Sequence, residues 1–330
     1  MKMILPVAGK GTRLRPHTHT KAKSLVQVAG KTVLEHIVER LLTLSAEELV
    51  FITDDNGQQI EQFMQRKFPD LKCSYVVQHE RLGPAHAVAL AKPRIEEGDD
   101  VLVVFNDTIF VTDLRRIPEL CREADGLIYS KEVEDYQRFG VNVLKDGFIV
   151  DMVEKPDTPV SRLAQVGLYY LKDGRKFMEY LDRTIGAGET VKGEYYLPSV
   201  FMRMIRDGMK FRAPEIDDWL DCGKPETLLE TNRFLLQNRH YCGGETIDTV
   251  IIEPVHLAEG ARVRGSILGP NVSIAAGTVI EESIIKDSII NAECQVSCMN
   301  LMSSILGDEV RLVGNPRRMN VGDHSLIEME

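Results

Sequence analysis

The chain has 330 residues, of which 43% are hydrophobic and 27% are charged, a composition typical of globular proteins with a sizeable core. Forty Lys and Arg against fifty Asp and Glu give a net charge of -10, which argues against nucleic acid or an anionic membrane surface as a partner. No apolar run approaches the roughly 18 residues of a membrane span, and the apolar N-terminal stretch is too short for a signal peptide, so we expect a cytoplasmic protein.

The first part of the chain alternates between strand and helix patterns. Apolar runs rich in β-branched residues predict strands over residues 2–7, 49–53, 73–78 and 101–105. Between them, apolar residues recur at helical spacing and predict helices over residues 33–41, 60–68 and 85–91. This alternation is typical of a parallel sheet with crossover helices, so we expect an α/β fold.

The middle of the chain changes character. Two short apolar runs, at 140–144 and 148–153, flank the turn dipeptide Asp146-Gly147 and predict an antiparallel hairpin. Helical patterns return at residues 175–181, 197–205 and 226–236. Gly243-Gly244 interrupts the last pattern, so we expect a boundary near residues 238–246 that separates a domain over residues 1–240 from one over residues 246–330.

The last part of the chain repeats short β-branched segments. Apolar residues recur six apart, as at Leu268, Ile274 and Ile280, with Gly and Asn between them. This period is typical of the hexapeptide left-handed parallel β-helix, here of three to four coils; an ordinary small β-sandwich is the alternative. Because such a solenoid is open-ended and leaves edges exposed, we expect the protein to form a homo-oligomer.

Two groups of side chains could suggest a metal site. Cys294 and Cys298 form a CxxxC pattern without partnering histidines, and we expect them to pack in the core as small hydrophobes. His17 and His19 lie beside a glycine-containing loop and could serve a metal or a phosphate, although ordinary loop positions are the favoured interpretation.

The turn after the first strand contains Gly9-Lys10-Gly11, in which small residues let the backbone approach a phosphate. It is not the dinucleotide-binding fingerprint, because Leu14 takes the place of the third glycine. Gly30-Lys31-Thr32 is not a P-loop either, because this motif needs a glycine at position 25, where the sequence has Leu25.

A longer string is far more specific. Residues 9–14 read GKGTRL and residues 21–25 read KAKSL, which resembles the signature of sugar-1-phosphate nucleotidylyltransferases, GxGTRL followed by PKPL. Ala22 and Ser24 replace the two prolines, while the lysine stays in place at Lys23. The resemblance continues in order through residues 78–87, 106–107, 139–140, 154–156, 166–169 and 219–223. It implies a Rossmann-like mixed-sheet nucleotidyltransferase domain, to which several family members append a β-helix.

The resemblance also implies how phosphates are handled. Arg13 and Lys23 would be catalytic, stabilising charge on the transferred α-phosphate and on the departing pyrophosphate. Asp107 and Asp221 would hold Mg²⁺, the expected cofactor, which typically takes one or two carboxylates plus phosphates. The nucleotide would be bound by Ala8, Gly9, Gly11, Thr12, Gln78 and Gly83.

Base and sugar recognition fall on later segments. The amide of Gln78 can donate and accept at once, which suits the imide edge of uracil or thymine. The sugar phosphate would be bound by Gly140, Glu154, Lys155, Val166 and Gly167. Phe139 replaces a tyrosine that is common beside the glycine in this family.

The predicted function is Mg²⁺-dependent transfer of a nucleotidyl group from dTTP or UTP to a hexose 1-phosphate, with glucose 1-phosphate and dTTP as the first choice. The partners are thus an NTP and a sugar 1-phosphate. The alternatives are GDP-mannose synthesis, nucleotidyl transfer to a phospho-alcohol, and a catalytically silent regulatory subunit of the same fold. Acyl transfer by the tail, near His256 or His324, is a further alternative to a purely oligomerising role.

Overall fold

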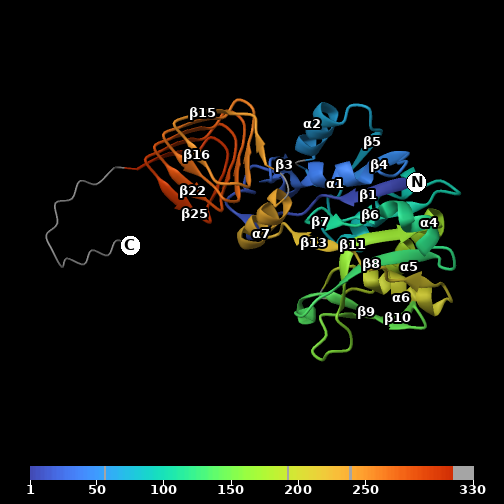
Figure 1. Cartoon of the computed structure of the whole chain (residues 1–330). Helices are drawn as coiled ribbons and strands as arrows, with labels where there is room; N and C mark the ends of the chain where they lie inside the picture. Colours follow the sequence, from blue (N-terminus) through green and yellow to red (C-terminus); the bar gives the residue numbers. More distant parts are fainter. Residues whose placement is uncertain (56, 192, 238–239, 315–330) are drawn as a thin grey trace. The chain divides into compact units, whose positions relative to one another are not determined.

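The computed structural model describes residues 1–55, 57–191, 193–237 and 240–314, which form two compact units (Figure 1). The first unit contains residues 1–26 and 31–228, and the second contains residues 27–30 and the chain from residue 229 onward. The division predicted from the sequence, into domains over residues 1–240 and 246–330, stays a prediction. Residues 238 and 239, which belong to the predicted boundary region, lie outside the described residues. So do residues 315–330 of the predicted tail domain, including His324.

A mixed sheet forms the centre of the first unit. In the described residues it has nine strands, seven of them in the order β10-β9-β11-β6-β1-β4-β5, while β8 pairs with β11 and β12. Strands β6, β1, β4 and β5 run parallel to their neighbours, as predicted, and β11 runs antiparallel to β6. The bounds are β1 (Lys2–Pro6), β4 (Glu48–Thr53), β5 (Cys73–Val77), β6 (Val101–Val104), β8 (Gly126–Glu132), β9 (Gly140–Lys145), β10 (Phe148–Glu154), β11 (Leu163–Leu171) and β12 (Phe211–Arg212).

Helices cover this sheet. Ile4 of β1 and Val103 of β6 pack with Val88, Phe177 and Phe201 from three helices in one buried cluster. Alternate residues of the same strands point to the opposite face and are also buried, so the central strands are apolar on both sides. The helices are α1 (Val33–Leu41), α2 (Gln58–Lys67), α3 (Pro84–Ala89), α4 (Ile117–Leu120), α5 (Gly174–Gly186), α6 (Leu197–Arg206) and α7 (Pro225–Leu236), with short 3-10 helices η1 (Thr12–Leu14), η2 (Lys23–Leu25), η3 (Lys92–Arg94), η4 (Leu114–Arg116) and η5 (Tyr136–Arg138).

A second, two-stranded sheet pairs distant parts of the first unit. Strand β7 (Thr108–Val111) lies antiparallel to β13 (Asp218–Asp221), with Asp221 opposite Thr108. Nothing in the sequence pattern predicts this pairing, because the two strands are separated by about a hundred residues and each has only four. This pairing brings the last of the motif segments, residues 219–223, next to the residues that follow β6.

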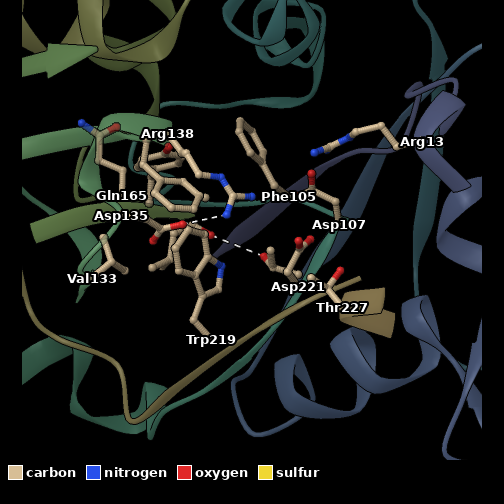
Figure 2. A pocket seen from close by; sticks show the side chains of 15 residues that line it. Arg13, Phe105, Asp107, Val133, Asp135, Arg138, Gln165, Trp219, Asp221 and Thr227 are labelled. Carbon is tan, nitrogen blue, oxygen red and sulfur yellow. Dashed lines mark hydrogen bonds and ion pairs between the residues drawn. The ribbon is translucent and has the colours of Figure 1, made fainter. Parts of the chain in front are cut away.

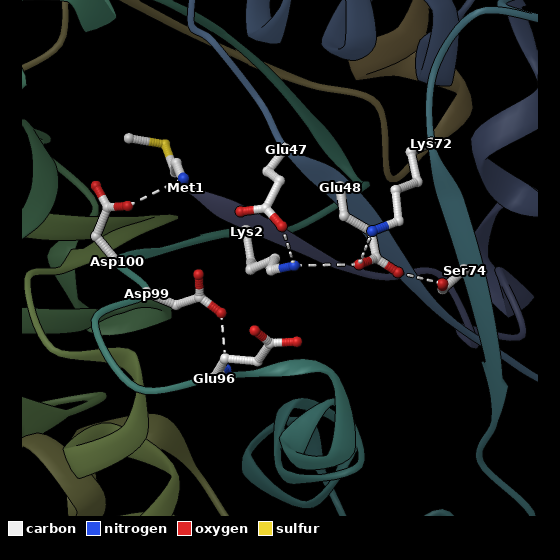
Figure 3. Close-up of polar contacts among 9 residues, drawn as sticks. All are labelled: Met1, Lys2, Glu47, Glu48, Lys72, Ser74, Glu96, Asp99 and Asp100. Carbon is white, nitrogen blue, oxygen red and sulfur yellow. Dashed lines mark hydrogen bonds and ion pairs between the residues drawn. The ribbon is translucent and has the colours of Figure 1, made fainter.

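The amino ends of the parallel strands carry a buried ionic cluster (Figure 3). Lys2 is 2% exposed and its Nζ lies 2.7 Å from Glu47 Oε1 and 3.3 Å from Glu48 Oε2. Lys72 also pairs with Glu48, and Ser74 donates a hydrogen bond to it. Burial alone would lower the pKa of Lys2, but the hydrogen bonds that Lys2 donates to the two glutamates outweigh it and raise that pKa above its usual range. These charges therefore satisfy one another at the edge opposite the predicted site.

The second unit contains a three-sided parallel β-helix, so the predicted fold class, an α/β domain followed by a left-handed β-helix, is confirmed and the β-sandwich is excluded. Figure 1 shows its short strands stacked coil on coil. The three faces, in the described residues, hold five, five and four strands. They are β14 (Tyr241–Cys242), β17 (Val255–Leu257), β20 (Val272–Ile274), β23 (Ile289–Ile290) and β26 (Ile305–Leu306); β15 (Glu245–Ile247), β18 (Arg262–Arg264), β21 (Val279–Glu281), β24 (Gln295–Ser297) and β27 (Arg311–Val313); and β16 (Val250–Ile251), β19 (Ile267–Leu268), β22 (Ile284–Lys286) and β25 (Asn300–Met302).

The β-helix is longer than the three to four coils predicted, because β14, β15 and β16 form a first coil whose sequence lacks the six-residue period. Residues with positive φ turn the chain at successive corners, as at Asp248, Gly265, Glu282 and Cys298. Strands β18, β21, β24 and β27 begin at residues 262, 279, 295 and 311, so a coil takes 16 or 17 residues rather than three full hexapeptides. With 16 or 17 residues to a coil, a strict six-residue period cannot continue unbroken from one coil to the next.

Segment 27–30 belongs to the second unit through a buried hydrogen-bond network. Strands β2 (Gln27–Val28) and β3 (Lys31–Thr32) form a hairpin whose turn residues, Ala29 and Gly30, both have positive φ. Asn232, fully buried on α7, accepts from the N–H of Ala29 at 2.9 Å and from Ser273 Oγ at 2.7 Å. A Cβ on Gly30 would collide with the ring of His256, so only glycine allows this approach.

Candidate active site

Four of the six predicted nucleotide-binding residues, together with the predicted metal ligand Asp107, gather at the carboxyl ends of the parallel strands, where open α/β sheets bind ligands. Ala8 and Gly9 follow β1, Gln78 follows β5 and Asp107 follows β6. All four line one cavity of about 270 Å³ that also includes Gly83, and we call it the Gln78 cavity. Motifs separated by up to a hundred residues in the sequence thus meet at one edge of the sheet.

Asp107 and Asp221, the two predicted metal ligands, lie side by side. The pairing of β7 with β13 continues past Asp221, where the N–H of Cys222 donates to the carbonyl of Asp107 at 2.9 Å. Both carboxylates line a second cavity, of about 370 Å³, which we call the Trp219 cavity. Two carboxylates on adjacent backbone segments are a donor set that suits Mg²⁺, which fills its remaining positions with phosphate oxygens and water.

Both predicted catalytic cations approach these carboxylates. Lys23, only 9% exposed, places Nζ at 3.2 Å from Asp107 Oδ2. Figure 2 shows the guanidinium of Arg13 pointing toward Asp107 from the neighbouring loop. A Cβ on Gly223 would lie 2.8 Å from Asp221 Oδ1 and 3.2 Å from Arg13 Nη2, so these two side chains flank the same glycine. Arg13, Asp107 and Asp221 therefore line the Trp219 cavity together, and Lys23, which lines a different cavity, reaches Asp107.

The predicted phosphate-binding turn is shaped by Gly11, which has a φ of +58°. A Cβ there would lie 3.1 Å from the Cβ of Lys23, and the carbonyl of Gly11 accepts a hydrogen bond from Thr18 Oγ1 at 2.7 Å. The predicted residue Thr12 begins η1, which carries Arg13. The turn is therefore packed directly against the segment that carries the lysine.

The far part of the Trp219 cavity is lined by aromatic and polar side chains (Figure 2). The rings of Phe139 and Trp219 have centroids 4.8 Å apart, and Arg138 pairs with Asp135 at 2.7 Å. The predicted sugar residues Val166 and Gly167 line the same cavity. Burial, then the negative charges of Glu154 and Asp107, raises the pKa of Tyr169, so its phenol stays protonated at the cavity wall.

The remaining predicted sugar residues lie on the hairpin of β9 and β10. Gly140 pairs with Glu154, and a Cβ on Gly140 would lie 2.8 Å from Glu154 Oε2. Lys155 has a φ of +47° and its Nζ lies 3.8 Å from Glu154 Oε1. The Cβ built on Gly140 would also lie 3.7 Å from Gln165, which lines the Trp219 cavity. Glu154 is thus a near neighbour of that cavity through Gly140 and Gln165.

Gln78 is held in a fixed orientation at its cavity. Its Nε2 lies 3.1 Å from His86 Nδ1 and 3.4 Å from the carbonyl of Gly83. Gly83 has a φ of +109°, and a Cβ there would lie 2.6 Å from the carbonyl oxygen of Tyr195, so glycine is required. The amide of Asn106 in the same cavity is buried without a hydrogen-bond partner among the described residues. Asn106 belongs to the motif at residues 106–107, but no role was predicted for it from the sequence.

A third cavity, of about 430 Å³, was not predicted. It is lined by the cationic residues Lys10, Arg15, Lys21, Lys23 and Arg81, together with His19, and we call it the Lys21 cavity. Gly9 and Arg81 line both this cavity and the Gln78 cavity. The signal was present in the sequence, since every one of these cations falls in or next to a family motif, but spacing alone does not show that they converge.

The metal sites considered for other residues find no support. The described part of the chain contains no cluster of three or more His, Cys, Asp or Glu side chains that could hold a metal ion. Cys294 is buried in the β-helix core, as expected for a small hydrophobe, but the same expectation for Cys298 was wrong, because that residue lies at a corner of the β-helix and is only partly buried. No disulfide joins any of the six cysteines, all of which lie in the described residues. Burial, then the charge of Lys21, lowers the pKa of His17, which keeps that imidazole neutral. No described helix is long and apolar enough to cross a membrane.

Comparisons with known proteins agree with these observations. Residues 2–238 match the family model described as Nucleotidyl transferase. Over the full length of both chains, the protein is 32% identical to a glucose-1-phosphate thymidylyltransferase of Streptomyces antibioticus. It is 34% identical to UTP–glucose-1-phosphate uridylyltransferase AglF of Haloferax volcanii, over 71% of this chain and 96% of the relative.

The fold is also shared with solved structures. A UDP-glucose pyrophosphorylase in complex with UDP-glucose superposes with a TM-score of 0.63 at 23% identity, over 72% of this chain and 99% of that one. The family match covers the sheet edge on which the three cavities lie, and the Streptomyces relative extends through the β-helix as well. The chain therefore belongs to the nucleotidyl transferase family and is a nucleotidyltransferase.

Proposed function

We propose that this protein joins a pyrimidine NTP to a hexose 1-phosphate, with Mg²⁺ as cofactor, giving an NDP-sugar and pyrophosphate. The observation that carries the proposal is the convergence of Arg13, Asp107 and Asp221 in the lining of the Trp219 cavity, with Lys23 Nζ 3.2 Å from Asp107. Two substrates that are both polyanions can react only where their charge is neutralised and their atoms are aligned. This arrangement supplies both cations and a carboxylate pair.

In the proposed reaction, a phosphate oxygen of the sugar phosphate attacks the α-phosphorus of the NTP in line with the bond to the β-phosphate. The new P–O bond forms as that bond breaks, and its electron pair leaves with pyrophosphate. A sugar phosphate has a second pKa of about 6 and is largely dianionic at neutral pH, so no general base is needed. Asp107 and Asp221 would hold Mg²⁺, which when bound neutralises phosphate charge.

The chain's own residues then divide the work. Arg13 and Lys23 stabilise negative charge on the α-phosphate and on the leaving group. The cations of the Lys21 cavity, with Arg15 and Arg81 among them, would attract the β- and γ-phosphates. Gln78 reads the base, and the Trp219 cavity with Glu154 and Lys155 receives the sugar and its phosphate.

Glucose 1-phosphate is the proposed acceptor, and dTTP is the proposed donor ahead of UTP. Relatives named for glucose 1-phosphate with each of these two nucleotides support this choice. A GDP-mannose synthase is a weaker candidate, because the spacing of Gln78 and Gly83 resembles that of the pyrimidine-using members of the family more than that of the guanine-using ones. A phospho-alcohol acceptor would leave Glu154 without a hexose to bind.

Initial pyrophosphate release in the presence of Mg²⁺ tests the proposal. The assay pairs dTTP, UTP, GTP, CTP and ATP in turn with glucose 1-phosphate, mannose 1-phosphate and phosphocholine. Release with dTTP or UTP and glucose 1-phosphate is the expected result. Failure of every pair to release pyrophosphate would instead favour a catalytically silent subunit, and a response to phosphocholine alone would identify a phospho-alcohol enzyme.

Self-association through the β-helix belongs to the same proposal. The face formed by β16, β19, β22 and β25 carries an outward ladder of Val250, Ile267 and Ile284, which are 56%, 36% and 48% exposed. A ladder of large apolar side chains on a flat parallel face is a surface that a second copy of the chain would cover. A cytoplasmic location is also proposed, and six cysteines that form no disulfide in the described residues suit a reducing compartment.

A further inference from the structure

The backbone just before Lys23 is held by a side chain from a different element. Gln59, on α2, accepts a hydrogen bond from the N–H of Ala22 at 3.0 Å through its Oε1. Its Nε2 donates to the carbonyl of Thr20 at 2.7 Å. One side-chain amide thus bridges two backbone groups on either side of Lys21, and all four residues line the Lys21 cavity.

Ala22 has the backbone conformation of a proline. Its φ of -59° and ψ of 140° fall in the polyproline II region, which a proline ring enforces with φ near about -65°. Alanine can adopt this conformation but is not restricted to it, so a contact such as the hydrogen bond to Gln59 is needed to hold the backbone there. The family signature PKPL has proline at this position, and a proline lacks the N–H that Gln59 binds here.

This restraint acts on the catalytic lysine. The segment continues directly into η2, which begins at Lys23, and the lysine ammonium ends 3.2 Å from Asp107. Lys23 is also packed against Gly11 of the phosphate-binding turn. A loop that sampled other conformations at residues 20–22 would move this ammonium away from the reacting phosphates, and misplacements of about 1 Å cost up to about 100-fold in rate.

We propose that Gln59 is a positioning residue for Lys23, and that its amide replaces the conformational restraint of a proline ring at residue 22. The rate measurements that test this inference rest on the proposed function. The hydrogen bonds made by Gln59 do not depend on that function. It assigns to α2 a role in catalysis without any contact between Gln59 and the reacting atoms.

A double-mutant cycle between residues 59 and 22 tests this assignment. Gln59→Ala should lower kcat for pyrophosphate release about 10-fold, because it frees the loop, while KM for the sugar phosphate stays nearly constant. Ala22→Pro alone should change kcat less than about threefold, since the ring fits the existing φ. In the double variant, the ring should restore kcat to within about threefold of wild type, a non-additive result that marks coupled residues.

Gln58→Ala is the matched control, because Gln58 is the exposed neighbour of Gln59 on the same helix. It should leave kcat unchanged. If Gln59 merely supported α2, Gln59→Ala would lower the melting temperature and proline at residue 22 would restore nothing. Unchanged kcat in Gln59→Ala, or no restoration by proline, would overturn the proposal.

Amide hydrogen exchange supplies a readout that needs no turnover. The N–H of Ala22 should be protected in the wild-type chain and exchange faster in Gln59→Ala, with no change in Gln58→Ala. Equal exchange in all three proteins would overturn the proposal even if the proline variants failed to fold. If the wild-type enzyme released no pyrophosphate, that result would count against the proposed function. Hydrogen exchange at the N–H of Ala22 would still show whether Gln59 restrains this loop.

Discussion

Lys23 and Asp107 form an ion pair in which Nζ and Oδ2 are 3.2 Å apart. The lysine is almost fully buried, whereas the carboxylate is 38% exposed and faces the Trp219 cavity. The pair thus links the segment after the predicted phosphate-binding turn to the end of β6. A metal ion bound by Asp107 would be repelled by the Lys23 ammonium, and a phosphate bound by Lys23 would be repelled by the carboxylate, so each side chain should affect the apparent affinity of the other's ligand.

Asp107→Asn tests the carboxylate side of this pair. The amide keeps the shape but removes the charge, so pyrophosphate release should fall by at least about 10- to 100-fold, as is typical of weakened metal sites. The Mg²⁺ concentration for half-maximal rate should also rise. Asp70→Asn, at an exposed aspartate of the loop before β5, is the control and should behave as wild type. Normal activity of Asp107→Asn with Mg²⁺ still required would remove Asp107 from the site.

Base selection should depend on the Gln78 cavity. We expect dTTP or UTP to be preferred over GTP by at least tenfold in kcat/KM, which corresponds to about 1.4 kcal/mol. A hydrogen bond between one side-chain amide and the base can supply a difference of this size. Steady-state kinetics with glucose 1-phosphate at saturation measures it, and Gln78→Leu should reduce the preference. A preference for GTP in the wild-type protein would refute this assignment of the base site.

The ionic cluster around Lys2 predicts a pH-dependent stability. Burial alone would raise the pKa of Glu48, but hydrogen bonds from Ser74, Lys2 and Lys72 outweigh it and lower that pKa below its usual value of 4.5. The unfolded chain therefore binds a proton that the folded chain does not, so this stabilisation is present above about pH 5 and is lost as the pH falls through the folded pKa.

Glu48→Gln should accordingly cost about 3 kcal/mol in unfolding free energy at pH 7, the scale for breaking a buried ion pair. Urea unfolding measured from pH 7 down to pH 3 should show the two proteins converging toward the acid end. Turnover by the folded variant should remain near wild type, because the cluster lies at the opposite edge of the sheet from the cavities. A constant difference at every pH would contradict the ionic explanation.

Removal of the tail after about residue 238 should separate association from chemistry. The oligomeric state in light scattering and the melting temperature should both fall, because the outward ladder is lost and Asn232 loses its contacts with Ser273 and Asn271. Pyrophosphate release per folded chain should fall much less, since every predicted site residue precedes residue 224. Complete loss of turnover in a folded truncation would mean that the tail helps to complete the active site.

Ile267→Lys with Ile284→Lys gives a milder version of that experiment. Both side chains point outward from the β-helix, so the coils should stay folded while a charged ladder repels a second copy. An unchanged oligomeric state would place the interface elsewhere.

The elements that were predicted well are those with strong local signals. Strands β1, β4, β5 and β6 end within one residue of the predicted bounds, because continuous apolar runs stop at Gly, Pro or polar residues. By contrast, β11 was not predicted as a strand, although it is the longest one in the sheet, because its role depends on three non-local partners. Tertiary pairing of this kind leaves no periodic trace in the sequence.

The same division applies to the candidate site. The convergence of Gln78, Gly83 and Asp107 follows from the rule that parallel strands end at one edge. The pairing of Arg138 with Asp135 in the Trp219 cavity, and the bridge that Gln59 makes to Ala22, had no sequence signal. Side chains that act from a neighbouring helix or loop are found only when the backbone path is known.

The turn at Ala29-Gly30 also affects when the second unit can be completed. Asn232 binds Ala29 across 203 residues of sequence, so the hairpin is synthesised long before the helix and coils that enclose it. Until then, the buried side of the turn has none of these partners, and contacts of such large sequence separation form slowly. A β-helix transplanted onto another protein from residue 246 onward would lack both the hairpin and Asn232. The coils from residue 246 onward are therefore not expected to fold as well when moved to another protein. An insertion or circular permutation at residues 27–30 would disrupt the β-helix unit as directly as a change within its coils.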